Sequence, residues 1–288
     1  MLQDLSFGRL YNEYKDVAPQ DGDVVICVQE SSVLLRRNPD DSLELPRYKE
    51  VCRWLEEEKW SSWNEDKFHY VFRLQDCNYF LWMGAAGACA DPGYHYENTR
   101  QLRQLQSKDI CFAAMTAWHL YVWYRNNQFC GRCATPTVHD KAERMLRCPQ
   151  CGNMIFPRIS PAVIIAVTDG DRLLLSKYAG RAYTRYALLA GYTEIGETLE
   201  QTVQREVMEE VGLRVKNIRY YKSQPWGVDG NVLMGFYCDL DGDDTVHLDQ
   251  NELAMAQWFP RNDLPAKDDG ISLTREMIRI FEEGKEPK

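Results

Sequence analysis

Three glutamates in the segment 191–213 have the spacing of a metal-binding helix face. Glu206, Glu209 and Glu210 stand three and four residues apart, so on a helix their side chains fall within an arc of about 100°. Like charges at this spacing destabilise a helix, whereas a hard divalent cation such as Mg²⁺ binds carboxylate oxygens and offsets the repulsion. The spacing is therefore typical of a magnesium site, or of a solvated acidic face.

The residues around these glutamates predict the helix that must position them. An apolar residue recurs at every fourth position: Leu199, Val203, Val207 and Val211. This period indicates an amphipathic helix over 198–211, and Gly212 suits the position that ends it. Arg205 can orient a neighbouring carboxylate, while Gly191 and Glu197 are expected on the loop before the helix.

Two C-x2-C pairs, separated by fourteen residues, predict a second metal site. The four residues are Cys130, Cys133, Cys148 and Cys151. Four thiolates complete a tetrahedral shell around zinc, so we expect one structural Zn²⁺ per chain with no open coordination position. Two redox-active pairs are the alternative, but neither pair begins a helix at a strand end. Since the shell is full without His139, this histidine is expected in a solvated loop.

The cysteine segment is also locally basic. Six basic and two acidic residues lie between Arg125 and Arg158, although the whole chain carries a net charge of −9. An acidic chain is not typical of a general nucleic-acid binder. Four thiolates around Zn²⁺ would lower the local positive charge by two. The local positive charge is therefore only weak evidence that this segment binds nucleic acid.

Length and composition indicate more than one folded domain. With 288 residues, 44% of them hydrophobic, the chain has the composition of a soluble globular protein. No apolar run reaches the length of a membrane helix, and the first residues do not resemble a signal peptide. We therefore expect a cytoplasmic protein that does not associate with membranes. The remaining cysteines are expected as buried thiols: Cys27, Cys52, Cys77, Cys89, Cys111 and Cys238.

The pattern of strands and helices predicts an N-terminal α+β domain over 1–125, a zinc ribbon over 126–157 and a further domain over 158–288. In the first domain, strands are expected at 23–28, 32–37, 69–74 and 78–84, and helices at 45–58 and 108–127. The last domain should combine strands at 162–168, 172–178, 218–224, 232–240 and 256–260 with the helix at 198–211 and a closing helix at 272–283.

The segment 191–213 resembles the Nudix box. In that motif a glycine is followed after five residues by a glutamate, and after seven more by Arg-Glu-apolar-x-Glu-Glu-x-Gly-apolar; every specified position is matched. The resemblance implies the Nudix fold, in which helices sandwich a mixed sheet. It also implies hydrolysis of a nucleoside diphosphate linked to another moiety, with Mg²⁺ or Mn²⁺ as the catalytic ion.

The surroundings of the box resemble the NADH pyrophosphatase (NudC) branch of this family across residues 125–285. The markers are the four-cysteine ribbon, FPRISPAVIIAV at 156–167, LLAGYTEIGE at 188–197 and SQPW at 223–226. The resemblance implies a homodimer in which Tyr192 stacks on adenine and Phe156 approaches the same base from the partner subunit. Judged alone, Tyr192 is as compatible with a place in the core as with a stacking surface, whereas Phe156 is expected in the core.

The resemblance also implies the other site residues. Glu252 would join the metal site, and one of the glutamates would handle the proton of the attacking water. The implied catalytic residues are Glu206, Glu209, Glu210, Arg205 and Glu252. The implied substrate-binding residues are Tyr192, Phe156, Gln224, Trp226 and Ser272, the last of these at the start of the closing helix.

Taken together, these features predict a zinc-stabilised, homodimeric hydrolase that cleaves the pyrophosphate of NAD(H) into nicotinamide mononucleotide and AMP. NAD-capped RNA is a further candidate substrate. One alternative is a Nudix hydrolase of ADP-ribose or dinucleoside polyphosphates. Another is a nucleic-acid-binding regulator whose Nudix domain only senses a ligand, but a sensor need not keep the complete carboxylate set.

The chain departs from the NADH pyrophosphatase branch after Trp226. Where the branch continues with Pro-Phe-Pro-x-Ser-Leu-Met, this chain has GVDGNVLM at 227–234, one residue longer, and residues 227–231 are expected as a loop. Two glycines and an aspartate predict a flexible, acidic loop. We therefore expect weak selectivity for the nicotinamide half of the substrate.

Overall fold

The structure is a computed structural model that describes the chain except for residues 6–8, 58–66, 85–90, 103–106, 181–183 and 266–268. Glu58, predicted as helical, and Cys89, predicted as a buried thiol, lie outside the described residues. The described residues divide into two compact units. The first comprises Met1–Leu2, Ile159–Trp226 and Asn231–Lys288, and the second comprises Gln3–Arg158 and Gly227–Gly230.

A mixed sheet forms the centre of the first unit. Its central strand β11 (Ser160–Asp169) pairs in parallel with β15 (Asn231–Leu240) and antiparallel with both β12 (Arg172–Tyr178) and β13 (Leu189–Tyr192). The strand order is β14-β15-β11-β12-β16, with β13 paired to β11 off this path. The edge strands are β14 (Val215–Trp226) and β16 (Leu253–Pro260).

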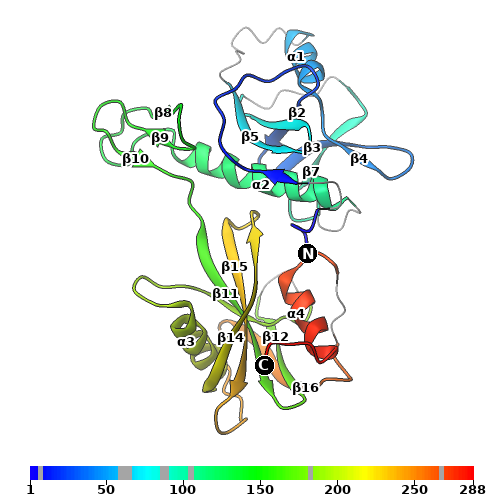
Figure 1. The fold of residues 1–288 in the computed structure, drawn as a ribbon, viewed down its shortest axis with the longest axis vertical. Helices are drawn as coiled ribbons and strands as arrows, with labels where there is room; N and C mark the ends of the chain where they lie inside the picture. The colour runs from blue at the N-terminus through cyan, green and yellow to red at the C-terminus, as the bar shows by residue number, and fades with distance from the viewer. Residues whose placement is uncertain (6–8, 58–66, 85–90, 103–106, 181–183, 266–268) are drawn as a thin grey trace. The chain divides into compact units, whose positions relative to one another are not determined.

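Two helices cover opposite faces of this sheet (Figure 1). Because side chains alternate along a strand, Val163 and Ile165 of β11 pack with α3 (Leu199–Val211), whereas Ile164 and Ala166 pack with α4 (Leu273–Glu282). A strand that is buried on both faces reads as a continuous apolar run. The predicted sandwich of helices around a mixed sheet is confirmed.

The second unit contains another sheet, with strand order β1-β5-β6-β2-β3-β4, and β7 pairs with β3. Its core is rich in aromatic side chains, including those of Trp54, Phe68, Phe80 and Trp82. The strands are β1 (Leu10–Tyr11), β2 (Val24–Gln29), β3 (Ser32–Arg37), β4 (Leu43–Glu44), β5 (Phe68–Leu74), β6 (Cys77–Trp82) and β7 (Tyr94–Asn98). The helices are α1 (Tyr48–Glu57) and α2 (Lys108–Asn126).

Most of the elements predicted for this unit are confirmed, although the short strands β1, β4 and β7 were not expected. Helix α2 is nearly apolar all round, and about half of its residues are buried. Among the helices of the described residues, none is both long enough and apolar enough to span a bilayer.

The cysteine segment forms a small sheet of β8 (Val138–His139), β9 (Leu146–Arg147) and β10 (Met154–Ile155). Contacts within the second unit tie it to the N-terminal sheet and α2. Arg144 Nη2 donates to the Val71 carbonyl (2.5 Å), and His139 Nε2 lies 2.7 Å from the Tyr124 hydroxyl. His139 also stacks on the ring of Tyr14. The expectation of a solvated histidine is therefore wrong, and the predicted boundary between residues 125 and 126 stays a prediction.

Candidate functional site

Helix α3 begins and ends where its sequence predicts. The Thr198 hydroxyl accepts a hydrogen bond from the Gln201 amide (3.2 Å), and the Gln201 side chain accepts one from the Thr198 amide (2.8 Å). This capping box satisfies backbone donors of the first turn. At the other end Gly212 has φ of +69°, the left-handed conformation that glycine adopts without strain. The two ends fix the bounds of the helix that carries the glutamates.

The three glutamates of α3 do not share one environment. Val203, Val207 and Val211 are fully buried against the sheet, and this packing turns Glu206 and Glu210 inward, where they are only 8% and 2% exposed. Glu209 is exposed. The helix therefore places two carboxylates at its junction with the sheet and one at its rim.

Strand β13 runs against this junction and has no side chain where Glu206 contacts it. A Cβ atom on Gly191 would lie 1.8 Å from the carboxyl carbon of Glu206. Only glycine leaves room for the carboxylate there. The expectation that Gly191 belongs to a loop is wrong, because Gly191 and the following Tyr192 form backbone pairs with Val163 and Ala162 of β11. Gly191 is therefore a strand residue whose missing side chain lets the Glu206 carboxylate lie against the backbone of β13.

All five N–H groups of Arg205 point at oxygen atoms. Nε and Nη2 donate to the two oxygens of Glu197 (2.6 and 2.9 Å), and Nη1 donates to Glu206 Oε1 (2.8 Å) and Glu209 Oε2 (2.9 Å). The remaining donor reaches the Tyr192 carbonyl (2.8 Å). These hydrogen bonds lower the pKa of Glu197 to about 2 and raise that of Arg205.

Glu252 is brought to this cluster by the fold. It lies just before β16, where its carbonyl accepts a hydrogen bond from the Ala179 amide (2.8 Å). Burial raises the pKa of the Glu206 carboxyl, and the nearby charges of Glu209 and Glu252 raise it further, while Arg205 lowers it. An all-carboxylate donor set of this kind suits a hard divalent cation.

Two of the predicted substrate-binding residues hold the start of α4. Gln224 is fully buried; its Nε2 donates to the Ile271 carbonyl and its Oε1 accepts from the Leu273 amide, both at 2.8 Å. Ser272 is the N-cap residue, and its hydroxyl accepts from the Arg275 amide (3.4 Å). Both residues therefore position the helix terminus, and their contact with substrate stays a prediction.

The remaining predicted residues differ in exposure. Half of the Tyr192 side chain is exposed, and its hydroxyl lies 3.2 Å from Oδ1 and 3.1 Å from Nδ2 of Asn231. Trp226 ends β14 and pairs with Asn231. Phe156 belongs to the second unit and is also about half exposed. Asn231 did not emerge as a site residue from the sequence, because it lies in no motif and falls within the segment that departs from the family pattern.

The segment 227–230 is a packed turn. The Val228 carbonyl accepts from Trp118 Nε1 (3.3 Å), and Asp229 pairs with Arg100 (2.8 Å). A Cβ on Gly227 would lie 2.3 Å from the Met115 carbonyl oxygen. Because α2 fixes the turn and Arg100 offsets its negative charge, the expectation of a flexible, acidic loop is wrong.

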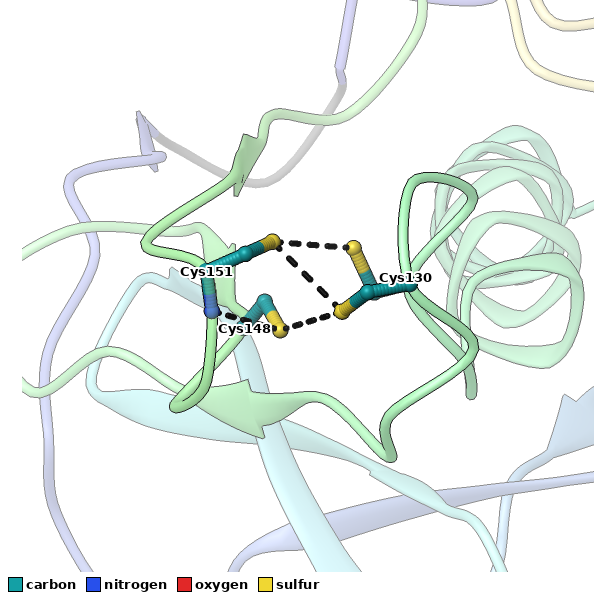
Figure 2. Close-up of side chains that lie close together, drawn as sticks. Cys130, Cys148 and Cys151 are labelled. Atoms are coloured by element: carbon teal, nitrogen blue, oxygen red, sulfur yellow. Dashed lines mark hydrogen bonds between the residues drawn. The ribbon is translucent and has the colours of Figure 1, made fainter.

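The four cysteine sulfurs of the ribbon converge, and all lie within 4.8 Å of one another. Figure 2 shows Cys130, Cys148 and Cys151 pointing toward a common centre. The shortest separations are 3.4 to 3.6 Å, close to the edge of roughly 3.8 Å of a tetrahedron with Zn–S bonds of about 2.3 Å. The Arg132 and Cys151 amides donate to Cys130 and Cys148 sulfurs. The donor set therefore fits a closed structural zinc site.

Comparisons with known proteins match two families to this chain. The NUDIX domain family matches residues 158–280, and the NADH pyrophosphatase zinc ribbon domain matches residues 125–156. A protein named NAD-capped RNA hydrolase NudC from Pectobacterium atrosepticum is 37% identical over 62% of this chain and 68% of its own length. One of the same name from Stutzerimonas stutzeri is 36% identical over 66% and 68% respectively. A crystal structure of a NUDIX hydrolase from Nitrosomonas europaea matches 54% of this chain and 91% of its own, at 24% identity and a TM-score of 0.47.

Proposed function

Because this chain belongs to the Nudix hydrolase family, in its NADH pyrophosphatase (NudC) branch, we propose that it hydrolyses the pyrophosphate bond of NAD(H) to nicotinamide mononucleotide and AMP. The observation that carries this proposal is the hydrogen bonding of Arg205, which holds Glu197, Glu206 and Glu209 together, with the charge of Glu252 near enough to raise the pKa of Glu206. Glu210, on the same side of α3 as Glu206, completes the proposed metal-binding set.

Each residue of the cluster has a definable task. Arg205 engages one oxygen of Glu206 and one of Glu209, so the second oxygen of each carboxylate is available to a cation. Bound Mg²⁺ or Mn²⁺ would supply positive charge for the pyrophosphate and activate a water. One glutamate of the set accepts the proton of that water. Arg205 keeps the carboxylates in place before substrate arrives, which lowers the cost of reorganisation during reaction.

The adenine half of the substrate is assigned to Tyr192. Tyr192 is the last residue of β13 and its ring is half exposed. Its backbone carbonyl accepts a hydrogen bond from Arg205, which also donates to the carboxylates. An aromatic face is a sequence-tolerant surface for stacking a base. We place Phe156 of the partner subunit against the same base, in a homodimer, and Gln224, Trp226 and Ser272 along the rest of the substrate. A cytoplasmic location is part of the same proposal.

NAD-capped RNA is a second candidate substrate. The curated relatives carry the name NAD-capped RNA hydrolase, and the ribbon segment of this chain has six basic residues against two acidic ones. Basic side chains bind phosphates without regard to sequence. ADP-ribose and dinucleoside polyphosphates are the alternative small substrates.

A nucleotide panel tests the proposal. The full-length protein is incubated with NADH, NAD, ADP-ribose, a dinucleoside polyphosphate and a short NAD-capped RNA, each with Mg²⁺, and the products are identified by mass. Nicotinamide mononucleotide and AMP are expected from NAD(H). If NAD(H) stays intact while another member is cleaved, the substrate assignment is wrong.

Two charge-removing variants test the carboxylates. Glu209→Gln and Glu210→Gln should each lower kcat by at least about 10²-fold, because each removes a charge that holds the cation. Glu200→Gln, an exposed position in the first turn of the same helix, is the matched control and should keep kcat within about twofold. Wild-type turnover by both of the first two variants at saturating Mg²⁺ would exclude the assignment.

A further inference from the structure

The exposed ring of Tyr192 is held at its far end by a buried amide. The Tyr192 hydroxyl lies within hydrogen-bond distance of both Oδ1 and Nδ2 of Asn231. Asn231 is only 8% exposed, whereas Tyr192 is 52% exposed. A partly exposed aromatic side chain on a strand can ordinarily exchange rotamers. Here the hydroxyl contact selects one orientation of the ring.

Asn231 is itself fixed by its backbone. It is the first residue of β15, where it pairs with Ser160 of β11 and Trp226 of β14. It follows Gly230, the last residue of the turn described above, which has φ of +70°. A strand position with paired neighbours on both sides and a defined turn before it gives the amide little freedom.

The Tyr192 main chain is fixed as well. Its residue pairs with Ala162 of β11, and its carbonyl accepts a hydrogen bond from Arg205. The only large freedom left to Tyr192 is therefore rotation of its side chain, and the contact with Asn231 removes that freedom. Both ends of the residue are tied, one to the carboxylate network and the other to the start of β15.

We propose that Asn231 is a positioning residue that holds the Tyr192 ring in the orientation needed to stack on the adenine of the substrate. The inference rests on the proposed function and deepens it, because it assigns a role to a residue outside the family motifs. A side chain that is ordered before binding loses less entropy when the ligand arrives. Asn231 should therefore act on binding of the adenine half and leave the chemical step unchanged.

A double-mutant cycle tests this role. Tyr192→Phe removes the hydroxyl and keeps the ring, and Asn231→Ala removes the amide. Each should raise KM for NADH by about three- to tenfold, the cost of immobilising one side chain, while kcat stays within about twofold. The KM of the double variant should be no higher than that of the single variant with the higher KM, since both changes remove the same hydrogen bond.

Inhibition by each of the two products separately distinguishes this role from a general structural one, because a structural defect would affect both inhibition constants. The inhibition constant of AMP should rise in both single variants, and that of nicotinamide mononucleotide should not. Tyr220→Phe is the matched control, because Tyr220 is an equally exposed tyrosine of the same unit (54%); it should leave all constants unchanged. If Asn231→Ala fails to fold, Tyr192→Phe with both inhibitors still decides the matter.

The outcomes separate the inference from the function on which it rests. Unchanged KM in both single variants, or fully additive effects in the double variant, would overturn the positioning role while hydrolysis persists. A Tyr192→Ala variant with wild-type KM would show that Tyr192 does not stack on the base. Absence of NADH hydrolysis by the wild-type protein would instead refute the proposed function itself.

Discussion

At the scale of single residues, the site is organised by one guanidinium group. Arg205 donates to three carboxylates and to a backbone carbonyl, a pattern that needs a planar donor fork. The same group links the proposed stacking residue Tyr192 to the proposed metal ligands. A shift of Arg205 would therefore disturb substrate binding and metal binding together.

Arg205→Lys should lower kcat by about 10- to 10²-fold, although the charge is kept. An ammonium group has three donors and no fork, so it cannot serve Glu197, Glu206, Glu209 and Tyr192 at once, and small misplacements of catalytic groups are costly. Steady-state kinetics with NADH and Mg²⁺ would measure the loss. Arg214→Lys, at an exposed position after the same helix, is the control; equal activity of both variants would count against the Arg205 network.

The pH dependence of stability should reveal the pair of Glu197 and Arg205. The folded-state pKa of Glu197 is lowered to about 2 from an ordinary value of 4.5, so protonation favours the unfolded chain. The contribution is present above about pH 4.5 and is lost as pH falls toward 2. Urea unfolding of the wild type and Glu197→Gln at several pH values should show a stability difference that shrinks across this window. A constant difference would contradict it.

At the scale of elements, the proposed active site depends on how closely α3 approaches β13. The capping box and Gly212 set the ends of the helix, three valines press it onto the sheet, and Gly191 leaves the space that the Glu206 carboxylate occupies. Close packing of this kind leaves no slack for an added methyl group.

Gly191→Ala should lower kcat by about 10²-fold, because a Cβ would lie 1.8 Å from the Glu206 carboxyl carbon and must displace it, and such misplacement costs catalysis heavily. Circular dichroism should show that secondary structure is retained. Gly22→Ala, where an added Cβ meets nothing within 4 Å, is the control. Normal turnover of Gly191→Ala would show that Glu206 does not need its observed position.

At the scale of the whole molecule, the two proposed metal sites belong to different units. The carboxylates lie in the first unit and the four cysteines in the second, where the ribbon packs on the N-terminal sheet and α2 through Arg144 and His139. Structural zinc supplies folding free energy to the unit that contains it. The ribbon metal is therefore assigned to stability and the carboxylate metal to chemistry.

Metal analysis should find about one zinc per chain, and Cys148→Ser should destabilise the protein by a few kcal/mol, as loss of a structural metal does. Differential scanning calorimetry would measure the change. Cys77→Ser, which alters a partly buried thiol outside the ribbon, is the control and should have a much smaller effect. A zinc-free protein with an unchanged melting temperature would refute the structural role.

What the sequence alone determined is local. The bounds of α3, its cap at Thr198 and its end at Gly212 follow from a helical period and from turn chemistry. The four cysteines follow from their spacing, and strand β11 follows from its continuous apolar run. The cap contacts of α3 lie within one turn, and the two cysteines of each pair lie on one tight turn, so backbone geometry alone relates spacing to position there.

The tertiary structure decided which distant residues meet. It brought Glu252 to Glu206, set Gly191 in a strand beneath that carboxylate, paired Asn231 with Tyr192, and packed the turn 227–230 on α2. It also packed His139 among aromatic side chains. No sequence period encodes these contacts, because each depends on strand pairing and on the packing of helices against sheets, which join segments far apart in the chain.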